Sequence, residues 1–263
     1  MIPADKQLDA WLRFAHELAD AAHALLAPAA ALAPEVQVKA DRSFVTALDA
    51  RIEARLREMI GARYPAHGIL GEEAGARALD ADGVWILDPI DGTAPFVAGV
   101  PVFGTLIALA WQGVPVLGVM HLPVTQQRYV GVSGRASTLN GTPIRTRRCD
   151  DMRGAILSTS NPDLMSDAER LALAALRERT AWRIYGGCCL SYGLLAAGRT
   201  DVAIDAGLAL YDYAPFRPLI EGAGGVITDW QGRAVTLAGG SRVLAAGDAR
   251  RHAEALALIA QVA

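Results

Sequence analysis

The chain has 263 residues, a length that suits one large α/β domain or two halves that share a core. Hydrophobic residues make up 52% and charged residues 20%, which excludes a disordered, collagen-like or disulfide-scaffold protein. With 25 basic and 28 acidic residues the formal net charge is -3. The sequence therefore offers no electrostatic case for nucleic acid or an anionic membrane as a partner, and a small molecule is the expected ligand.

The predicted elements of the first half are two amphipathic helices followed by five short strands, of which the last three form an antiparallel meander. The helices are expected at about 8–32 and 45–60. The strands are expected at about 68–70, 84–87, 103–111, 114–122 and 128–132. Between the helices, Asp41 and Ser43 favour a turn in a polar connection.

From about residue 150 strands and helices alternate, which indicates a second α/β half. Strands are expected at 155–159, 182–185, 202–205, 226–228 and 242–245. Helices are expected at 167–179, 188–197, 212–222 and 249–262. We therefore expect an N-terminal α+β half at 1–150 and a C-terminal α/β half at 151–263.

The cysteines and the first residues indicate a cytoplasmic protein. The three cysteines, Cys149, Cys188 and Cys189, suit neither a disulfide framework nor a zinc site. The start of the chain lacks the basic head and apolar run of a signal peptide. Prolines and glycines interrupt the uncharged stretch 92–127, so we expect buried strands there and not a membrane helix.

Acidic residues at strand ends are the strongest local signal. The segment GEEAG occupies 71–75, and a second segment, VWILDPIDGTAPF, begins at residue 84. Asp88 ends an apolar strand, Pro89 forces an extended turn, and Asp91 returns a second carboxylate. Oxygen ligands of this kind select hard cations, Mg2+ above all or Mn2+.

A bland alternative is that Asp91 only caps a short helix that starts at Gly92 and Thr93. Several carboxylates in apolar surroundings are costly without a cation, which favours the metal site. The same helix start offers free amides and a positive dipole end for phosphate. The histidines show no metal-ligand spacing and are interpreted as surface or packing residues: His16, His23, His67, His121 and His252.

Taken together in chain order, the acidic and glycine motifs resemble the signature of the inositol monophosphatase family over most of the chain. The motifs are Asp49, Glu72 with Glu73, DPIDGT at 88–93, Tyr211 with Asp212, and Gly224 with Gly225. The resemblance implies a layered αβαβα sandwich of the α/β class and a Mg2+-dependent, lithium-sensitive phosphatase of small phosphate monoesters, often a homodimer. The family usually has Trp where this chain has Tyr211. Because that residue supports a ligand and is not one itself, little loss is expected.

The resemblance also implies roles for individual residues. Two metal ions, or three with a weak site near Asp49, are held by oxygen ligands from Glu72, Asp88, Ile90 (through its carbonyl), Asp91 and Asp212. Glu72 and Thr93 position and activate the attacking water, and the Gly92 and Thr93 amides hold the phosphate. Asp49 acts around the metals, while Glu73 is either a direct partner or a hydrogen-bonded neighbour. Such chemistry needs no covalent nucleophile.

The substrate is the least defined feature. Segments 96–123 and 191–208 look closer to the histidinol-phosphate phosphatase branch than to the inositol branch. Matching by position assigns substrate contacts to Gly186, Gly187, Cys188 and Asp205, although Asp205 can equally be the polar end of a strand. Cys188 stands where the histidinol-phosphate branch commonly has Asp.

Histidinol phosphate, or a broader range, is therefore the expected substrate, and myo-inositol 1-phosphate is the alternative. An alternative of another class is a regulatory or metal-binding protein without turnover. The presence of Thr93 and of the full ligand set argues against it, because a structural metal site has no use for a hydroxyl that orients water.

Overall fold

The computed structural model describes residues 3–30, 36–38 and 44–262. Its helices are α1 (Asp5–Ala29), α2 (Ala47–Arg63), α3 (Thr93–Ala98), α4 (Asp167–Arg179), α5 (Cys188–Ala196), α6 (Leu210–Tyr213), α7 (Phe216–Gly222) and α8 (Ala249–Ile259), with 3-10 turns η1 (Met152–Gly154) and η2 (Pro162–Leu164). Its strands are β1 (Val36–Val38), β2 (Phe44–Thr46), β3 (Gly68–Gly71), β4 (Gly75–Arg77), β5 (Gly83–Asp91), β6 (Gly104–Trp111), β7 (Val114–Leu122), β8 (Gln127–Val132), β9 (Thr138–Leu139), β10 (Thr142–Pro143), β11 (Ile156–Thr159), β12 (Trp182–Tyr185), β13 (Val202–Asp205), β14 (Val226–Thr228) and β15 (Val243–Ala246).

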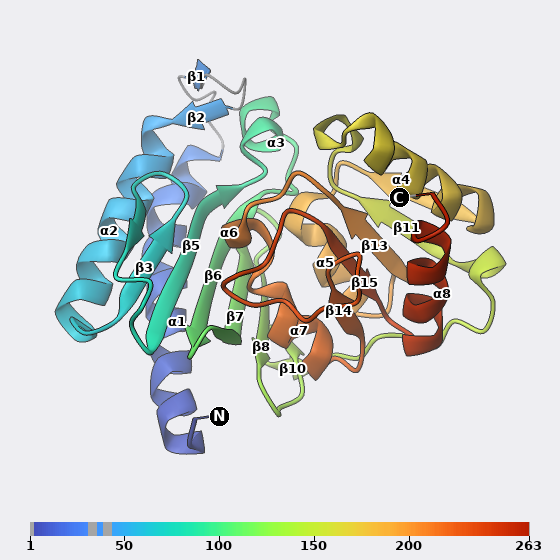
Figure 1. Ribbon diagram of the computed structural model, residues 1–263. Helices are drawn as coiled ribbons and strands as arrows, with labels where there is room; N and C mark the ends of the chain where they lie inside the picture. Colours follow the sequence, from blue (N-terminus) through green and yellow to red (C-terminus); the bar gives the residue numbers. More distant parts are fainter. Residues whose placement is uncertain (1–2, 31–35, 39–43, 263) are drawn as a thin grey trace.

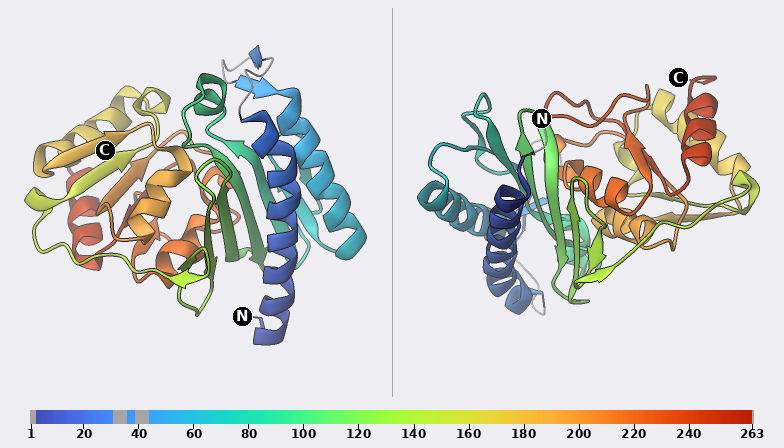
Figure 2. Two further views of the ribbon diagram at one scale, coloured as in Figure 1. Left: turned by 180° about the vertical axis from the view of Figure 1, so that it is seen from behind. Right: turned by 90° about the horizontal axis from the view of Figure 1, so that it is seen from below.

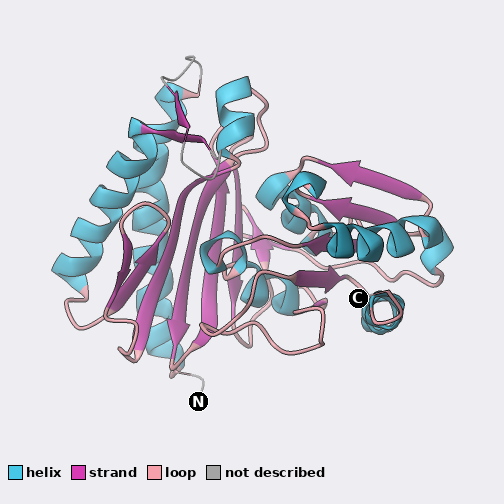
Figure 3. Cartoon of the chain, turned by 45° about the horizontal axis from the view of Figure 1, so that its top comes forward, coloured by secondary structure: helices cyan, strands magenta, loops and turns pink. Residues whose placement is uncertain are grey.

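These elements stack in five layers (Figure 1). Helices α1 and α2 cover the outer face of an eight-stranded sheet, as the view from behind shows (Figure 2, left). Helices α5, α6 and α7 lie between this sheet and a five-stranded sheet, whose outer face carries α4 and α8 (Figure 3). The predicted αβαβα sandwich is confirmed.

The strand order of the large sheet is β10-β9-β8-β7-β6-β5-β3-β4, and the small sheet runs β12-β11-β13-β15-β14. Strands β6, β7 and β8 form the predicted antiparallel meander, whereas β3 and β5 are parallel. Within the small sheet, β11 is parallel to both β12 and β13. The parallel pairs matter for the site, because their carboxyl ends lie at one edge of each sheet.

Local sequence explains how the long helices begin and where they pack. The Thr46 hydroxyl and the Asp49 carboxylate form a capping box at the start of α2, and Ser166 with Glu169 does the same for α4. On the inner face of α1, Trp11 is fully buried in a cluster that also contains Trp85 of β5. Burial of such aromatic side chains is worth about 1.5–3 kcal/mol each.

The structure differs from the prediction in two regions and adds the short strands β4, β9 and β10 to the large sheet. The helix expected at 212–222 is two helices, α6 and α7, separated by Pro215. Proline lacks the amide that would continue the α6 ladder, so the chain turns there. The polar connection before α2 contains a two-stranded ladder, with β1 antiparallel to β2, while the predicted turn residues Asp41 and Ser43 lie outside the described residues.

The two sheets share one core. Leu106 and Met120 of the large sheet pack in the same cluster as Tyr192 of α5 and Ile227 of β14. The large sheet ends at Pro143 and the small sheet starts at Ile156, but the shared cluster joins them, and the division at residue 150 stays a prediction. No helix in the described ranges is long and apolar enough to cross a membrane.

Candidate active site

A β-bulge brings the two aspartates of the DPID segment to the same face of the large sheet. Asp88 is paired with Leu106 and Asp91 with Gly104, so two residues of β5 lie opposite Thr105 alone. Side chains alternate between faces along a regular strand, and a separation of three would place the aspartates on opposite sides. The extra residue restores them to one side, which faces the C-terminal half. The Thr105 hydroxyl stabilises the bulge by donating to the Pro89 carbonyl at 2.8 Å.

Asp88 lies at the centre of a concentration of negative charge. Its side chain is 1% exposed, and its Oδ1 atom has no hydrogen-bond partner among the described residues. Burial raises its pKa well above the usual value, and four other carboxylates add to the effect: Glu72, Asp91, Asp212 and Asp49. These acids come from α2, the β3–β4 turn, β5 and α6, so the fold brings together carboxylates that are far apart in the sequence.

Two of the neighbouring carboxylates are held by backbone amides. The Cys189 amide at the start of α5 donates to Asp91 Oδ2 at 2.7 Å, and the Ala209 amide donates to Asp212 Oδ2 at 2.7 Å. Burial raises the pKa of Asp91 to about 6 despite the Cys189 bond. Burial likewise raises the pKa of Asp212 to about 8, with Asp91 as the largest charge contribution. Both groups therefore resist carrying a negative charge unless a cation is present.

Asp49 is bound on one side only. Its Oδ2 accepts from the Thr46 amide at 2.8 Å and from the Thr46 hydroxyl at 2.6 Å, while Oδ1 is buried without a partner among the described residues. Burial raises its pKa, and Glu73 is the neighbouring charge that adds to the shift. Asp49 thus combines a structural role at the start of α2 with one free ligand atom near the site.

The sequence analysis missed Glu53, which holds the loop that carries Glu72. Its side chain is 1% exposed and accepts from the Glu73 amide at 2.7 Å and the Ala74 amide at 3.0 Å. It also pairs with Arg57 at 2.7 Å. Gly71 leaves room for this carboxylate, because a Cβ there would lie 2.3 Å from Glu53 Oε1. The available signal was an acid next to Ile52 on the buried face of the predicted helix.

The α3 start lies directly after the bulge. The Thr93 hydroxyl donates to the carbonyl of Ile90 at 3.1 Å, which places it beside a predicted metal ligand. Gly92 has φ 79°, and a Cβ there would approach Cys188 Sγ to 3.1 Å. The first amides of a helix have no partner within it, so those of Gly92 and Thr93 are available for a phosphate oxygen.

A cavity of about 980 Å3 opens between the two halves at this point. Its walls include predicted site residues from both halves, namely Glu72, Asp91, Gly92, Thr93, Gly186, Cys188 and Asp212. Asp88, Asp49 and the Ile90 carbonyl belong to the packed layer around it and not to its lining. In the part of the chain that the structure describes, no Lys, Arg or His lines this cavity.

Asp205 lies differently from the expectation. It is 1% exposed and does not line the cavity. Its oxygens accept four hydrogen bonds, from the Thr159 hydroxyl, the Ser160 amide and hydroxyl, and the Tyr192 hydroxyl, at 2.7–3.1 Å. The predicted direct contact with the substrate alcohol is therefore not supported by this geometry: Asp205 fixes two residues of the cavity wall.

The other predicted substrate contacts lie where β12 leads into α5. Gly186 and Cys188 line the cavity, whereas Gly187 does not. Gly187 is packed against Ser191, whose Oγ would lie 2.4 Å from an added Cβ. Tyr211, the departure from the family pattern, packs beside Val84 and Ile86 of β5 and next to Asp212. An aromatic ring is thus retained in the supporting position.

The residues fit a hard cation by their chemistry. In the described part of the chain, no three His, Cys, Asp or Glu side chains already stand in an arrangement that could hold a metal ion. The unpartnered Oδ1 atoms of Asp88 and Asp49, and the raised pKa of Asp88, nevertheless mark a charge imbalance that Mg2+ would relieve.

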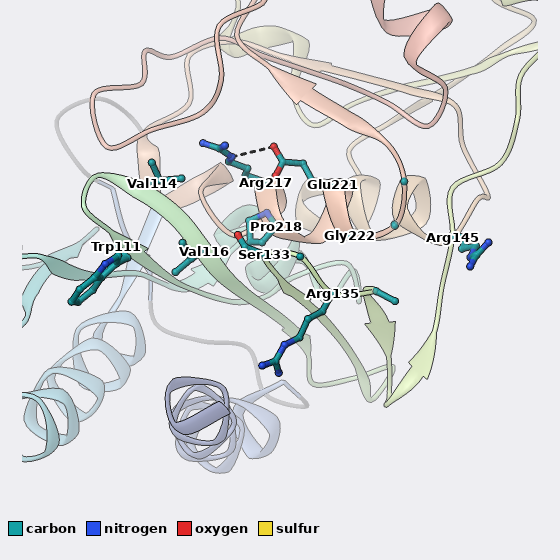
Figure 4. Close-up of a pocket in the computed structure, with 14 residues that line it drawn as sticks. Trp111, Val114, Val116, Ser133, Arg135, Arg145, Arg217, Pro218, Glu221 and Gly222 are labelled. Carbon is teal, nitrogen blue, oxygen red and sulfur yellow. Dashed lines mark hydrogen bonds and ion pairs between the residues drawn. The ribbon is translucent and has the colours of Figure 1, made fainter. Parts of the chain in front are cut away.

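A second cavity, of about 750 Å3, lies by α7 and the meander and contains none of the predicted site residues (Figure 4). Arg135, Arg145 and Arg217 line it but point in different directions. Arg217 pairs with Glu221 at 3.1 Å, and Arg135 pairs with Asp5 and Asp9 on α1. These guanidinium groups do not converge, so the cavity is not an anion site.

Comparison with known proteins agrees with the site. The model of the inositol monophosphatase family matches residues 7–263. The bifunctional phosphatase IMPL2 of Arabidopsis thaliana, a chloroplastic protein, is 40% identical over 262 residues, covering 96% of this chain and 76% of the relative. The histidinol-phosphatase of Mycobacterium tuberculosis is 36% identical over 209 residues, covering 77% and 80% of the two chains.

A solved inositol monophosphatase from Zymomonas mobilis superposes with a TM-score of 0.88 at 37% identity, covering 98% of this chain and 100% of that one. The Nus factor SuhB of Escherichia coli is 31% identical over 205 residues, covering 76% and 77% of the two chains. The family model spans nearly the whole sequence, and the predicted acidic motifs meet around one cavity, whereas Gly224 lines the second one. The chain belongs to the inositol monophosphatase family and is a phosphatase of that family.

Proposed function

We propose that this chain hydrolyses a small phosphate monoester by direct attack of water, with Mg2+ as cofactor and Mn2+ as a substitute. The observation that carries the proposal is the set of carboxylates around Asp88 at the edge of the 980 Å3 cavity. Glu72, Asp88, Asp91, Asp212 and the Ile90 carbonyl would hold the metal ions. Mg2+ supplies positive charge that polarises the phosphate and lowers the pKa of water.

The protein's own groups then position the reactants. Glu72 accepts a proton from the attacking water, and the Thr93 hydroxyl orients that water. The hydrogen bond from Thr93 to the Ile90 carbonyl, 3.1 Å long, fixes the hydroxyl and leaves its oxygen free to accept. The Gly92 and Thr93 amides hold the phosphate. Positioning and charge stabilisation of this kind account for most of the rate in phosphoryl transfer.

Histidinol phosphate is the proposed substrate, within a range that includes other small monoesters. Support comes from the cavity, whose described lining is acidic and contains no cationic residue, and from the relative whose name is histidinol-phosphatase. Myo-inositol 1-phosphate is the competing substrate, supported by the solved inositol monophosphatase. Cys188 lines the cavity in place of the acid common in the histidinol-phosphate branch, so restoring it with Cys188→Asp should favour a cationic substrate.

A substrate panel in Mg2+ tests the proposal, with histidinol phosphate, inositol 1-phosphate and glycerol phosphate as members. Thr93→Ala should lower kcat by about 10^2-fold and leave KM nearly unchanged, because an oriented water matters in the transition state. A change in KM alone would reassign Thr93 to phosphate binding. No turnover of any member, with or without Mg2+, would leave a regulatory role as the function.

Three further properties belong to the same proposal: inhibition by Li+ at the metal site, a homodimer and a cytoplasmic location. Li+ competes with Mg2+ for the same oxygen ligands, so inhibition by Li+ should weaken as the Mg2+ concentration rises. Light scattering on the purified chain decides between monomer and dimer.

A further inference from the structure

The wall of the active-site cavity opposite the metal ligands ends in a turn that the reaction itself does not use. This turn follows β11 and comprises Ser160, Asn161 and η2. The cavity-lining residues on it are Ser160, Asn161, Pro162, Asp163 and Leu164. Tyr185, at the end of the neighbouring strand β12, lines the same side.

Asp163 is the only acid on this wall, and its carboxylate has no hydrogen bond or ion pair to any described residue. Its amide donates to Asn161 Oδ1 at 3.0 Å, so only the backbone of Asp163 is engaged. The three other lining acids, Glu72, Asp91 and Asp212, belong to the metal site. Asp205 lies behind the wall with all its oxygens bonded, which leaves Asp163 as the acid that can face the leaving alcohol.

The turn that carries Asp163 is held in place from both ends. Asn161 caps η2, and Pro162 occupies its first turn. Met165, directly after the turn, is 2% exposed. On the other side Gly207, with φ 77°, lets Leu164 approach closely, because a Cβ there would lie 2.8 Å from the Leu164 carbonyl oxygen. A preordered acid loses little entropy when it binds a ligand.

The charge of the cavity selects the sign of the ligand group. Among the described residues, four carboxylates line the cavity and no Lys, Arg or His does. Metal ions at the metal site would offset its acids and attract the phosphate, whereas Asp163 belongs to the turn after β11 and is not one of the predicted metal ligands. Leu164 is 54% exposed and Tyr185 is 46% exposed, so an apolar and aromatic surface lies beside this charge. Such a combination suits a cation carried on a carbon skeleton.

We propose that Asp163 binds the positively charged group of the substrate alcohol and so selects amino-alcohol phosphates over neutral polyol phosphates. This inference rests on the proposed phosphatase function and names a specificity residue for it. Asp205 then acts as a positioning residue that holds Ser160 and Tyr192, and its loss affects cationic and neutral substrates alike.

The test compares Asp163→Asn with the wild type at saturating Mg2+, on histidinol phosphate and on inositol 1-phosphate. We expect kcat/KM for histidinol phosphate to fall about five- to tenfold, mainly through KM, while inositol 1-phosphate changes less than twofold. The loss should shrink at high salt, because Asp163 is exposed to solvent. Asp167→Asn is the matched control, since Asp167 is an exposed acid at the start of α4 that pairs with Arg170; it should change neither substrate.

Binding of L-histidinol in the presence of Mg2+ and phosphate, measured by calorimetry, gives a readout that does not need turnover. Asp163→Asn should raise its Kd about five- to tenfold. Equal losses for both substrates, or an unchanged histidinol Kd, overturn the inference while leaving a working phosphatase intact. Absence of turnover in the wild type overturns the proposed function instead, and the histidinol Kd still decides the role of Asp163.

Discussion

Two clusters of titratable side chains lie on opposite faces of the large sheet, and they differ in how far their charges are compensated by neighbouring side chains. On the inner face, Asp88, Asp91 and Asp212 have raised pKa values. On the outer face, His121 of β7 contacts His23 of α1 through ring nitrogens 2.9 Å apart. Burial and the nearby Arg128 lower the pKa of His121 to about 4. Burial disfavours charge in both clusters.

The difference lies in the partners. Arg128 donates to His121 Nδ1 at 3.4 Å, contacts His16 and pairs with Asp20, so the outer cluster is connected by hydrogen bonds and an ion pair. The inner cluster contains no cationic side chain and keeps buried oxygens without partners among the described residues. A closed network of this kind serves packing, whereas an uncompensated one points to a bound ion.

The first way to break the comparison is Asp88→Asn. We expect kcat/KM to fall by about 10^3-fold or more, because the carboxylate at the centre of the proposed metal site is lost. Without Mg2+ the Tm of Asp88→Asn should not fall below that of the wild type, because asparagine removes a buried negative charge and has nearly the same shape as aspartate. Asp82→Asn, at the exposed opposite end of the β5 segment, is the control and should keep full activity. Unfolding of Asp88→Asn, or near-wild-type turnover, contradicts the assignment.

Glu53→Ala examines a third type of buried acid, one with all partners in place. We expect the free energy of unfolding to drop by about 3 kcal/mol, because two backbone amides and Arg57 lose their acceptor. Urea denaturation measures the change. Glu58→Ala on the same helix should cost less than about 0.5 kcal/mol, since its pair with Arg55 is exposed. Equal effects of the two variants would show that Glu53 does not hold the loop.

Metal addition sharpens the contrast between the faces. At a concentration about 100 times its Kd, Mg2+ should stabilise the wild type by about 2.7 kcal/mol, and a chelator should reverse the shift in Tm. Asp88→Asn should show a much smaller shift, and His121→Gln should show the full one. If Mg2+ does not raise the Tm of the wild type, the result argues against a metal site on the inner face.

The pH dependence of stability should have opposite signs for the two clusters. The folded-state pKa of His121, about 4, lies below the ordinary histidine pKa of 6.5, so the unfolded chain binds more protons between these values. Its contribution is therefore complete above pH 6.5 and is lost as pH falls to 4. The metal-free carboxylates Asp91 and Asp212 have raised pKa values, and their contribution is lost as pH rises toward 8.

This pH dependence is the smallest of the four predicted effects, and it is measured as the difference between His121→Gln and the wild type. Between pH 7 and 5, His121→Gln should lose less unfolding free energy than the wild type, even where it is less stable at pH 7. Thermal unfolding at several pH values measures it. Identical slopes for the two proteins would mean that His121 is protonated in the folded state.

The sequence predicted the parts of the site that short segments encode. Asp88 and Asp91 were recognisable because strand end, proline and glycine stand together in DPIDGT, and parallel strands carry the neighbouring acids to the same sheet edge. Asp205 was less predictable, since its four partners come from β11, the following turn and α5. Whether a carboxylate faces a cavity or lies behind it depends on those side chains and not on its own strand.

The histidines show the same limit from the other direction. His16 and His23 are seven residues apart on α1, which places them on one helix face, but His121, the partner of His23, is 98 residues further along the chain. The interpretation of the histidines as packing residues agrees with the neutral network around Arg128. The scattered positions of the histidines in the sequence do not predict that three of them lie close together.

The bulge in β5 makes the active site sensitive to the number of residues in β5 and β6 around it more than to their kind. Inserting one residue next to Thr105 in β6 would restore regular pairing and turn Asp91, three residues after Asp88, to the opposite side of the sheet. Asp91 would then point at α1 and α2, and the Cys189 amide would lose its acceptor. A transfer of this segment into another scaffold must therefore preserve the bulge, because the bulge decides the face of the sheet to which each later side chain points. No choice of side chains can compensate for its loss.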